Sequence, residues 1–306
     1  MKIAILGLGG VGGTVAGALK DAEQDLVCIV RGKTKEAVEK NGFLLDSELL
    51  GMRRVHPAVI SDDPAEIGVV DILLLCCKGY SLEEACEKYA SIVGEETIVI
   101  PLLNGVTASR EVSRCLHGKG QIAEGYIYCY SFIAEPGVVT NRSDLLSMGF
   151  GFADGRKNEK LDTLKLLLLK GGMPFADGGD VLTEIWKKYL MMCGNSAAFL
   201  YYDGSAGCIQ QDAERMAFLE KIYKELCSLG IACGAKLSDT IVEAYLEKFR
   251  AFPAETTSSL YRDVRDGKPQ TELEAVMGGG CRLAEEMELN VPCLKAAYEK
   301  AKEKIK

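Results

Sequence analysis

Short apolar runs alternate with amphipathic segments through the first third of the chain. A glycine-rich stretch after the first run leads into a helix-like segment through Leu19. The segment 81–93 begins with Ser81 and has Glu84 three residues later, the capping-box signature of a helix start. Continuous apolar strands separated by helices are typical of a parallel sheet covered on both faces. The pattern therefore predicts a doubly wound α/β unit with strands at 2–6, 26–30, 71–77 and 97–103.

The pattern changes near residue 121. Strand-like segments follow one another from 121 to 152 without helices, and we expect them to form an antiparallel extension of the sheet. A helix over 158–170 comes next. Long helical periods then lie at 181–201, 211–229, 238–250, 254–265, 271–288 and 293–305. The sequence therefore predicts two domains, an α/β domain over 1–179 and an all-helical domain over 180–306.

Composition excludes several classes of protein. Of the 306 residues, 48% are hydrophobic and 26% are charged, an ordinary globular mix. The formal net charge of −8 repels phosphate backbones, so we expect no nucleic-acid partner. No apolar run approaches the roughly 18–20 residues needed to cross a membrane, so we expect no membrane association.

The cysteines do not indicate a metal site or a disulfide-stabilised secreted protein. Twelve are scattered without a CxxC pair, and with only two histidines the spacing of a zinc site is missing, so we expect no metal. The N-terminal segment MKIAILGLGG lacks the features of a signal peptide. These observations favour reduced cysteines, many of them core fillers, in a cytoplasmic protein.

The first candidate site is the glycine cluster after the first strand. Gly7, Gly9 and Gly12 fit G-x-G-x-x-G between a strand and a helix, the context that gives this motif its meaning. Gly7 permits the tight turn, Gly9 lets the backbone approach a pyrophosphate, and Gly12 lets the helix pack closely on the strand. The pattern predicts dinucleotide binding at the helix N-terminus.

The end of the second strand predicts which dinucleotide is bound. An NAD site usually has Asp or Glu there for the ribose 2′-hydroxyl, whereas this chain continues Val30-Arg31-Gly32-Lys33. A guanidinium can hold a 2′-phosphate through two parallel hydrogen bonds. We therefore expect NADP (NADPH), bound with the help of Arg31.

Four further polar residues are candidates. Lys78 and Asn104 follow the third and fourth apolar runs, at the sheet edge where ligands bind in open α/β folds. Lys187 and Lys188 open a strongly apolar helical segment, where partial desolvation would ease proton release. Adjacent helical side chains point about 100° apart, so one of the two can face inward. Loop lysines, a turn-forming asparagine and surface lysines would explain the same residues.

Near the C-terminus, Thr271 is a plausible N-cap for a helix that has Glu272 in its first turn. Capping alone accounts for Glu272. The periodicity therefore assigns this carboxylate no chemical role.

The ordered set of motifs resembles the ketopantoate reductase (2-dehydropantoate 2-reductase) family over nearly the full length. The matching pieces are GLGGVG, Arg31, CCKGY, LLNGV, EPGVV, EIWKKYL, TTSSLYRDVRDGKPQTE and NVPCL. The resemblance implies a Rossmann domain and a helical domain like that of 6-phosphogluconate dehydrogenase. It also implies an NADPH-dependent oxidoreductase of pantothenate synthesis that acts on a small 2-oxo acid.

The resemblance assigns roles to matching positions. Lys188 falls on the general acid that protonates the ketone oxygen as hydride reaches C2. Glu272 falls on the glutamate that orients this lysine and binds the substrate. The other matches are Ser259 for the substrate, Asn104 for the cofactor and substrate junction, Lys78 near the cofactor, and Arg31 for the 2′-phosphate.

Several positions depart from the family pattern. Where the family has asparagines four and eight residues after the lysine, this chain has Met192 and Ser196, so Ser196 is the remaining polar candidate for substrate contact. Asn195 would need a local shift to serve. Met277 stands where asparagine is frequent, and Gln270 is one extra residue before the T-E pair. An apolar wall at Met192 favours a less polar substrate.

Three hypotheses follow. The first is ketopantoate reduction. The second is a related 2-oxo acid reductase or D-2-hydroxy acid dehydrogenase with a less polar substrate. The third is a dinucleotide-binding protein without catalysis, against which the presence of Lys188 and Glu272 argues. Pairing of two helical domains in a homodimer stays open.

Overall fold

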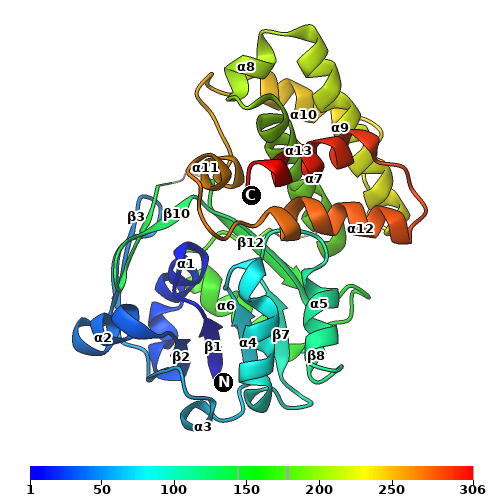
Figure 1. The fold of residues 1–306 in the computed structure, drawn as a ribbon. Helices are drawn as coiled ribbons and strands as arrows, with labels where there is room; N and C mark the ends of the chain where they lie inside the picture. The colour runs from blue at the N-terminus through cyan, green and yellow to red at the C-terminus, as the bar shows by residue number, and fades with distance from the viewer. Residues whose placement is uncertain (143–144, 177–178, 306) are drawn as a thin grey trace. The chain divides into compact units, whose positions relative to one another are not determined.

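The computed structural model describes residues 1–142, 145–176 and 179–305 and divides the chain into two compact units (Figure 1). The first unit consists of Met1–Leu103 and Ser109–Val181, and the second of Asn104–Ala108 and Leu182–Lys306. The short segment Asn104–Ala108 follows the fourth predicted strand but belongs to the helical unit. The predicted class, a Rossmann-type unit followed by a helical one, is confirmed.

A six-stranded parallel sheet in the order β5-β2-β1-β6-β7-β8 forms the centre of the first unit. All residues of β1, β2, β6 and β7 are buried, which explains why each strand is an unbroken apolar run. The strands are β1 (Ile3–Leu6), β2 (Leu26–Ile29), β5 (Val59–Ser61), β6 (Ile72–Leu75), β7 (Ile98–Pro101) and β8 (Gln121–Ile122).

Helical segments connect these strands. They are α1 (Gly10–Ala18), η1 (Lys20–Asp25), α2 (Gly32–Asn41), α3 (Pro64–Ile67), η2 (Gly79–Ser81), α4 (Leu82–Tyr89), η3 (Ala90–Ile92), α5 (Ala108–Cys115) and α6 (Glu159–Lys170). The predicted capping box at Ser81 is wrong. Ser81 precedes α4, but its side chain makes no capping bond, because the turn η2 gives it φ −107° and ψ 4° instead of the extended backbone of an N-cap.

The strands after residue 121 do not form the expected antiparallel extension of the parallel sheet. Among the described strands of this part of the chain, only the short strand β8 joins that sheet, and it does so in parallel. The others form a four-stranded sheet in the order β10-β11-β3-β4 and a two-stranded sheet of β12 and β9. The reason is that β3, which the sequence pattern did not reveal, pairs in parallel with β11, while β4, also not predicted, pairs with β3 in antiparallel fashion. The bounds are β3 (Phe43–Ser47), β4 (Gly51–Val55), β9 (Glu124–Tyr128), β10 (Ser131–Glu135), β11 (Val138–Asn141) and β12 (Ser147–Gly151).

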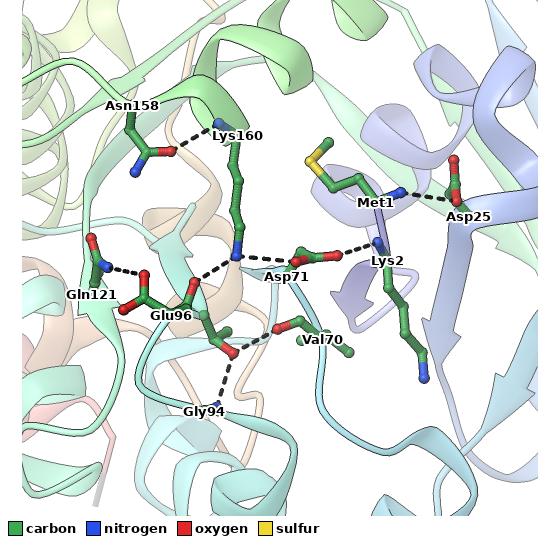
Figure 2. Close-up of polar contacts among 11 residues, drawn as sticks. Met1, Lys2, Asp25, Val70, Asp71, Gly94, Glu96, Gln121, Asn158 and Lys160 are labelled. Carbon is green, nitrogen blue, oxygen red and sulfur yellow. Dashed lines mark hydrogen bonds and ion pairs between the residues drawn. The ribbon is translucent and has the colours of Figure 1, made fainter.

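Polar contacts join the chain segments at the amino ends of the parallel strands (Figure 2). Asp71, just before β6, accepts from the Lys2 backbone N–H at 2.8 Å and pairs with Lys160 Nζ at 3.0 Å. Lys160, in α6, also donates to the Glu96 carbonyl at 2.8 Å. These contacts stabilise the amino ends of the parallel strands, whereas the glycine cluster lies at the carboxyl end of β1.

The second unit is helical. Its elements are α7 (Val181–Tyr202), α8 (Ala206–Gln210), α9 (Ala213–Ala232), α10 (Ile241–Arg250), α11 (Ser259–Arg265), the π-helical turn η4 (Glu274–Gly278), α12 (Gly279–Glu286) and α13 (Pro292–Glu303). Its core contains the only tryptophan, Trp186, packed edge-on against Tyr189 with ring centroids 5.5 Å apart. Two predicted helices differ in detail: the region 254–258 is not helical, and the helix expected over 271–288 contains the π turn.

The twelve cysteines are thiols. Burial raises the pKa of Cys86 and of Cys193 to about 12, which keeps these two protonated as core residues. Among the described residues, no helix is long and apolar enough to cross a membrane.

Candidate active site

The glycine cluster forms the connection between β1 and α1. Gly7 has φ +96° and donates its N–H to the Ile29 carbonyl at 3.0 Å. A Cβ on Gly12 would stand 1.9 Å from the Gly7 carbonyl oxygen, so the close approach of α1 to the loop requires glycine there. A Cβ on Gly9, the residue before α1, would have no atom within 4 Å. The space in front of the helix N-terminus fits the pyrophosphate of a dinucleotide.

A chain of side-chain hydrogen bonds ties the start of α1 to the second sheet. Thr14 donates to the Gly10 carbonyl and lies 2.8 Å from the Ser131 hydroxyl in β10. Asn141, fully buried at the end of β11, donates to the same hydroxyl at 2.8 Å, and Ser47 in β3 donates to Asn141 Oδ1 at 3.0 Å. These contacts position the glycine cluster. They join residues up to 117 positions apart, and no sequence signal indicated them.

A cavity of about 260 Å³ opens beside the glycine cluster. It is lined by the glycine loop, the end of β2 with the start of α2, the region of α4, and Ile133 of β10. The polar or charged lining side chains are Arg31, Thr34, Ser81, Glu84, Lys88 and Tyr89. The first unit therefore holds, by itself, a cavity with glycine backbone on one side and charged groups on another.

Arg31, predicted as the 2′-phosphate ligand, lines this cavity and precedes α2. Its guanidinium lies 4.0 Å from the Glu84 carboxylate, and both side chains are about three-quarters exposed, at 77% and 74%. Such a pair is weak in water, so an anionic ligand can replace Glu84 as the partner of Arg31. Sequence reasoning assigned Glu84 only a capping role and did not indicate Lys88, because both residues come from α4, more than 50 residues after Arg31.

Lys78 lies at the same carboxyl edge of the sheet. It is exposed and stands between β6 and α4, directly before η2. The neighbouring Cys77 lines the cavity, whereas Lys78 is not among the lining residues. Lys78 is thus placed beside the cavity rather than in its wall.

In the second unit, Lys188 Nζ donates to Asn104 Oδ1 at 3.2 Å. The structure thus brings together two residues that are 84 positions apart in the chain. The neighbouring Lys187 instead pairs with Glu184 at 2.7 Å and is 37% exposed. The two adjacent lysines therefore have different partners, and Lys188 is the one that contacts another candidate residue.

Glu272 is buried, with 6% of its surface exposed. Its carbonyl accepts the Val276 N–H at 2.9 Å, and the Thr271 hydroxyl accepts the Leu273 N–H at 3.4 Å. The predicted capping role of Thr271 is thus present in a long, weak form. A carboxylate that is almost fully buried is unusual unless it has partners or a chemical role.

The remaining candidates lie at two helices. Ser259 is the exposed first residue of α11, and the preceding Ser258 caps that helix by accepting the Tyr261 N–H at 3.1 Å. Ser196, on α7, is 1% exposed and donates its hydroxyl to the Met192 carbonyl at 2.7 Å. Asn195 accepts from the buried Tyr223 hydroxyl at 2.5 Å and is thus held in the core.

Among the residues that the structure describes, no group of three or more His, Cys, Asp or Glu side chains could hold a metal ion.

Comparisons with known proteins agree on one family. The model described as "Ketopantoate reductase PanE/ApbA" matches residues 3–155, and the one described as "Ketopantoate reductase PanE/ApbA C terminal" matches residues 180–305. The chain is 25% identical over 298 residues to an uncharacterized oxidoreductase, YkpB, of Bacillus subtilis (strain 168), with 97% of each chain covered.

Solved structures share the fold. The 2-dehydropantoate 2-reductase from Porphyromonas gingivalis W83 superposes with a TM-score of 0.81 at 26% identity, with 98% of each chain covered. A D-mandelate dehydrogenase solved with NADH and anilino(oxo)acetate has a TM-score of 0.81 at 17% identity. That match covers 100% of this chain and 98% of the other, and it shows likeness of fold alone.

Proposed function

The chain belongs to the ketopantoate reductase family, and from that premise we propose that it reduces 2-dehydropantoate (ketopantoate) to pantoate with NADPH, a step of pantothenate synthesis. The observation that carries this proposal is the contact between Lys188 and Asn104. The sequence predicts a role for both residues, and both come from motifs shared with the family. Membership in the family makes this chain an oxidoreductase of the ketopantoate reductase type, which acts on a CH–OH group.

The cofactor residues belong to the first unit. Gly7, with φ +96°, makes the tight turn after β1, and Gly9 leaves the backbone open to a pyrophosphate at the N-terminus of α1, where N–H groups can bind it. Arg31 would hold the 2′-phosphate in place of its weak partner Glu84. When bound, NADPH supplies the hydride that reaches C2 of the substrate.

The proton comes from the second unit in this proposal. Lys188 gives a proton to the C2 oxygen as that carbon receives the hydride, so the ketone becomes an alcohol and the lysine becomes neutral. Asn104 accepts one of the three ammonium N–H groups and thereby fixes the direction of Nζ. Glu272 and Ser259 are assigned to the substrate by their match to the family motifs.

The test is NADPH oxidation followed by absorbance with ketopantoate, pyruvate, and branched and phenyl-substituted 2-oxo acids. NADH is run in parallel with each acid. The proposal predicts the highest kcat/KM for ketopantoate with NADPH. Absence of turnover on every 2-oxo acid with both cofactors would refute the reductase assignment.

A second candidate is reduction of a less polar 2-oxo acid. The half-buried Met192 lies one helical turn beyond Lys188 on α7. The Ser196 hydroxyl donates to the Met192 carbonyl, and Asn195 accepts from the Tyr223 hydroxyl. The side chains at these positions therefore supply little hydrogen bonding for a hydroxylated substrate. A protein of the same fold, D-mandelate dehydrogenase, has been solved with NADH and anilino(oxo)acetate.

Met192→Asn tests this candidate, with Met191→Asn as the control because Met191 is the half-buried neighbour on the same helix. If Met192 selects an apolar substrate, Met192→Asn raises the ratio of kcat/KM for ketopantoate over the phenyl-substituted acid by roughly 10-fold or more. Met191→Asn leaves the ratio near the wild-type value. Equal ratios in the three proteins would remove Met192 from substrate selection.

A further inference from the structure

The π turn η4 receives a side chain from the helix that carries Lys188. Tyr189, the next residue of α7, is 1% exposed and donates its hydroxyl to the Val276 carbonyl at 2.6 Å. Cys193, one helical turn further along, donates to the same carbonyl at 3.5 Å. A π turn interrupts the regular hydrogen-bond ladder of a helix, and such turns are frequent at functional sites. Here two side chains of α7 bind one carbonyl within it.

Two glycines make room for these contacts. A Cβ on Gly280 would stand 2.2 Å from the Tyr189 hydroxyl, so any side chain at position 280 would displace that hydroxyl from the Val276 carbonyl. Gly105, from a distant part of the sequence, lies against the π turn, because a Cβ on it would stand 2.5 Å from the Ala275 carbonyl oxygen. Gly105 has φ +104°, a backbone conformation that favours glycine. Two segments of the second unit that are distant in sequence, one with Gly105 and one with Tyr189, thus meet at the π turn.

These two segments and the residues directly before the π turn each carry one candidate residue of the active site. Lys188 precedes Tyr189, Asn104 precedes Gly105, and the carbonyl of Glu272 accepts the N–H of Val276, the residue whose own carbonyl receives Tyr189. The backbone of η4 is therefore contacted by segments 104–105 and 188–189 and is joined to Glu272 through the Val276 N–H. A displacement of this turn moves the three candidate residues relative to one another.

We propose that Tyr189 is a positioning residue for the reduction: its bond to the π turn holds Glu272 and Asn104 in register with Lys188. The inference rests on the proposed reductase function and adds a residue that no motif identified. Tyr189 acts through its neighbours, and it needs no contact with substrate or cofactor. Burial among apolar groups raises its pKa well above the usual range, so the hydroxyl remains a donor at any working pH.

The test is Tyr189→Phe, which removes only the hydroxyl. Tyr223→Phe is the matched control, because Tyr223 is a fully buried tyrosine of the same core that donates to Asn195 at 2.5 Å, away from the π turn. Each change removes one donor from a buried acceptor, although the Val276 carbonyl keeps the Cys193 thiol, so both should lower the melting temperature. The measurements are kcat, KM for the best 2-oxo acid, and the Kd of NADPH by titration, at a temperature where both variants are folded.

The proposal predicts that Tyr189→Phe lowers kcat at least 10-fold, shifts the pH profile of turnover, and keeps the Kd of NADPH within about twofold of wild type. Tyr223→Phe keeps both kcat and its pH profile. The proposal would be overturned if kcat fell equally in the two variants, or if Tyr189→Phe kept kcat within threefold of wild type. An inactive wild-type protein would instead refute the reductase assignment, so the two failures are distinguishable.

If Tyr189→Phe does not fold, the π turn can be approached from Gly105. Gly105→Ala places a methyl group against the Ala275 carbonyl, whereas Gly118→Ala, with φ +75° and no atom within 4 Å of the added Cβ, introduces comparable backbone strain in open space. The proposal predicts that Gly105→Ala alone lowers kcat at least 10-fold. The same turnover in both alanine variants would contradict it.

Discussion

Two glycines of one motif, three residues apart, should respond oppositely to the same substitution. A Cβ on Gly12 would stand 1.9 Å from the Gly7 carbonyl oxygen and 3.0 Å from Cys76 Cβ, and both atoms belong to the first unit. A Cβ on Gly9 would touch nothing within 4 Å, and Gly9 has φ −77°, which any residue adopts. We therefore expect Gly12→Ala to impair folding and Gly9→Ala to impair cofactor binding.

The magnitudes follow from these contacts. Overpacking typically costs about 1–3 kcal/mol, and a clash with a backbone atom belongs at the upper end. The helix preference of alanine over glycine returns about 1 kcal/mol, so Gly12→Ala should lose about 2 kcal/mol of unfolding free energy. At roughly 2–4 °C per kcal/mol in a unit of this size, its melting temperature should fall by about 4–8 °C.

For Gly9→Ala the stability terms nearly cancel. As an N-cap, alanine is less favourable than glycine by a few tenths of a kcal/mol or more. Alanine also lowers the conformational entropy of the unfolded chain, which stabilises the folded state by a similar amount. The methyl group instead blocks the approach of a pyrophosphate. Losing one hydrogen bond to a charged group, worth about 1.5–3 kcal/mol, weakens NADPH binding roughly 10- to 100-fold.

The assays are thermal unfolding by circular dichroism without cofactor and calorimetric titration with NADPH. The reasoning predicts a lower melting temperature for Gly12→Ala and a wild-type one for Gly9→Ala, with the weaker binding in Gly9→Ala. It would be refuted by a wild-type melting temperature in Gly12→Ala, or by wild-type affinity for NADPH in Gly9→Ala. A Gly9→Ala protein that loses stability and affinity together would show that the loop is not preformed.

Three further predictions concern single side chains. Lys188→Ala should lower kcat about 10²- to 10⁴-fold with NADPH affinity unchanged, while Lys187→Ala stays near wild type; similar turnover in the two variants would remove Lys188 from proton transfer. Arg31→Ala should weaken NADPH much more than NADH, measured by titration, and equal losses would mean that the 2′-phosphate is bound elsewhere. The Lys2 N–H and Lys160 hold the pKa of Asp71 below its ordinary value of 3.8 against the effect of burial. The stability from this ionised carboxylate is therefore present above pH 3.8 and is lost as pH falls through the lower pKa of the folded state, so the difference in melting temperature between wild type and Asp71→Asn should shrink below about pH 4.

The parallel strands were predictable because burial on both faces makes each an unbroken apolar run, as in β6 (ILLL). The strand β4 (GMRRV) was not, because most of its residues are exposed and it has no regular alternation of apolar positions. Its place depends on long-range contacts instead. Arg53 in this strand donates to the Leu50 carbonyl and, 118 residues along the chain, to the carbonyl of Gly171.

The site shows the same division. The glycine cluster was readable because its demands are local: a positive φ at Gly7 and a close approach at Gly12 involve the turn and the strand beside it. Glu84 near Arg31 and the chain from Thr14 to Asn141 depend on elements brought together by the sheet. A single sequence carries no signal for such pairs, because each partner is an ordinary polar residue in its own segment.

The two adjacent lysines show why residue types alone were insufficient. Glu184 stands three residues before Lys187 and four before Lys188, and both spacings permit a helical ion pair. In the structure Glu184 pairs with Lys187, while Lys188 turns about 100° away and donates to Asn104. What separates them is the placement of segment Asn104–Ala108 with the helical unit, although it directly follows a strand region of the first unit. The lysine that we propose as the proton donor is therefore distinguished by where one loop packs, and that packing brings Gly105 against the π turn.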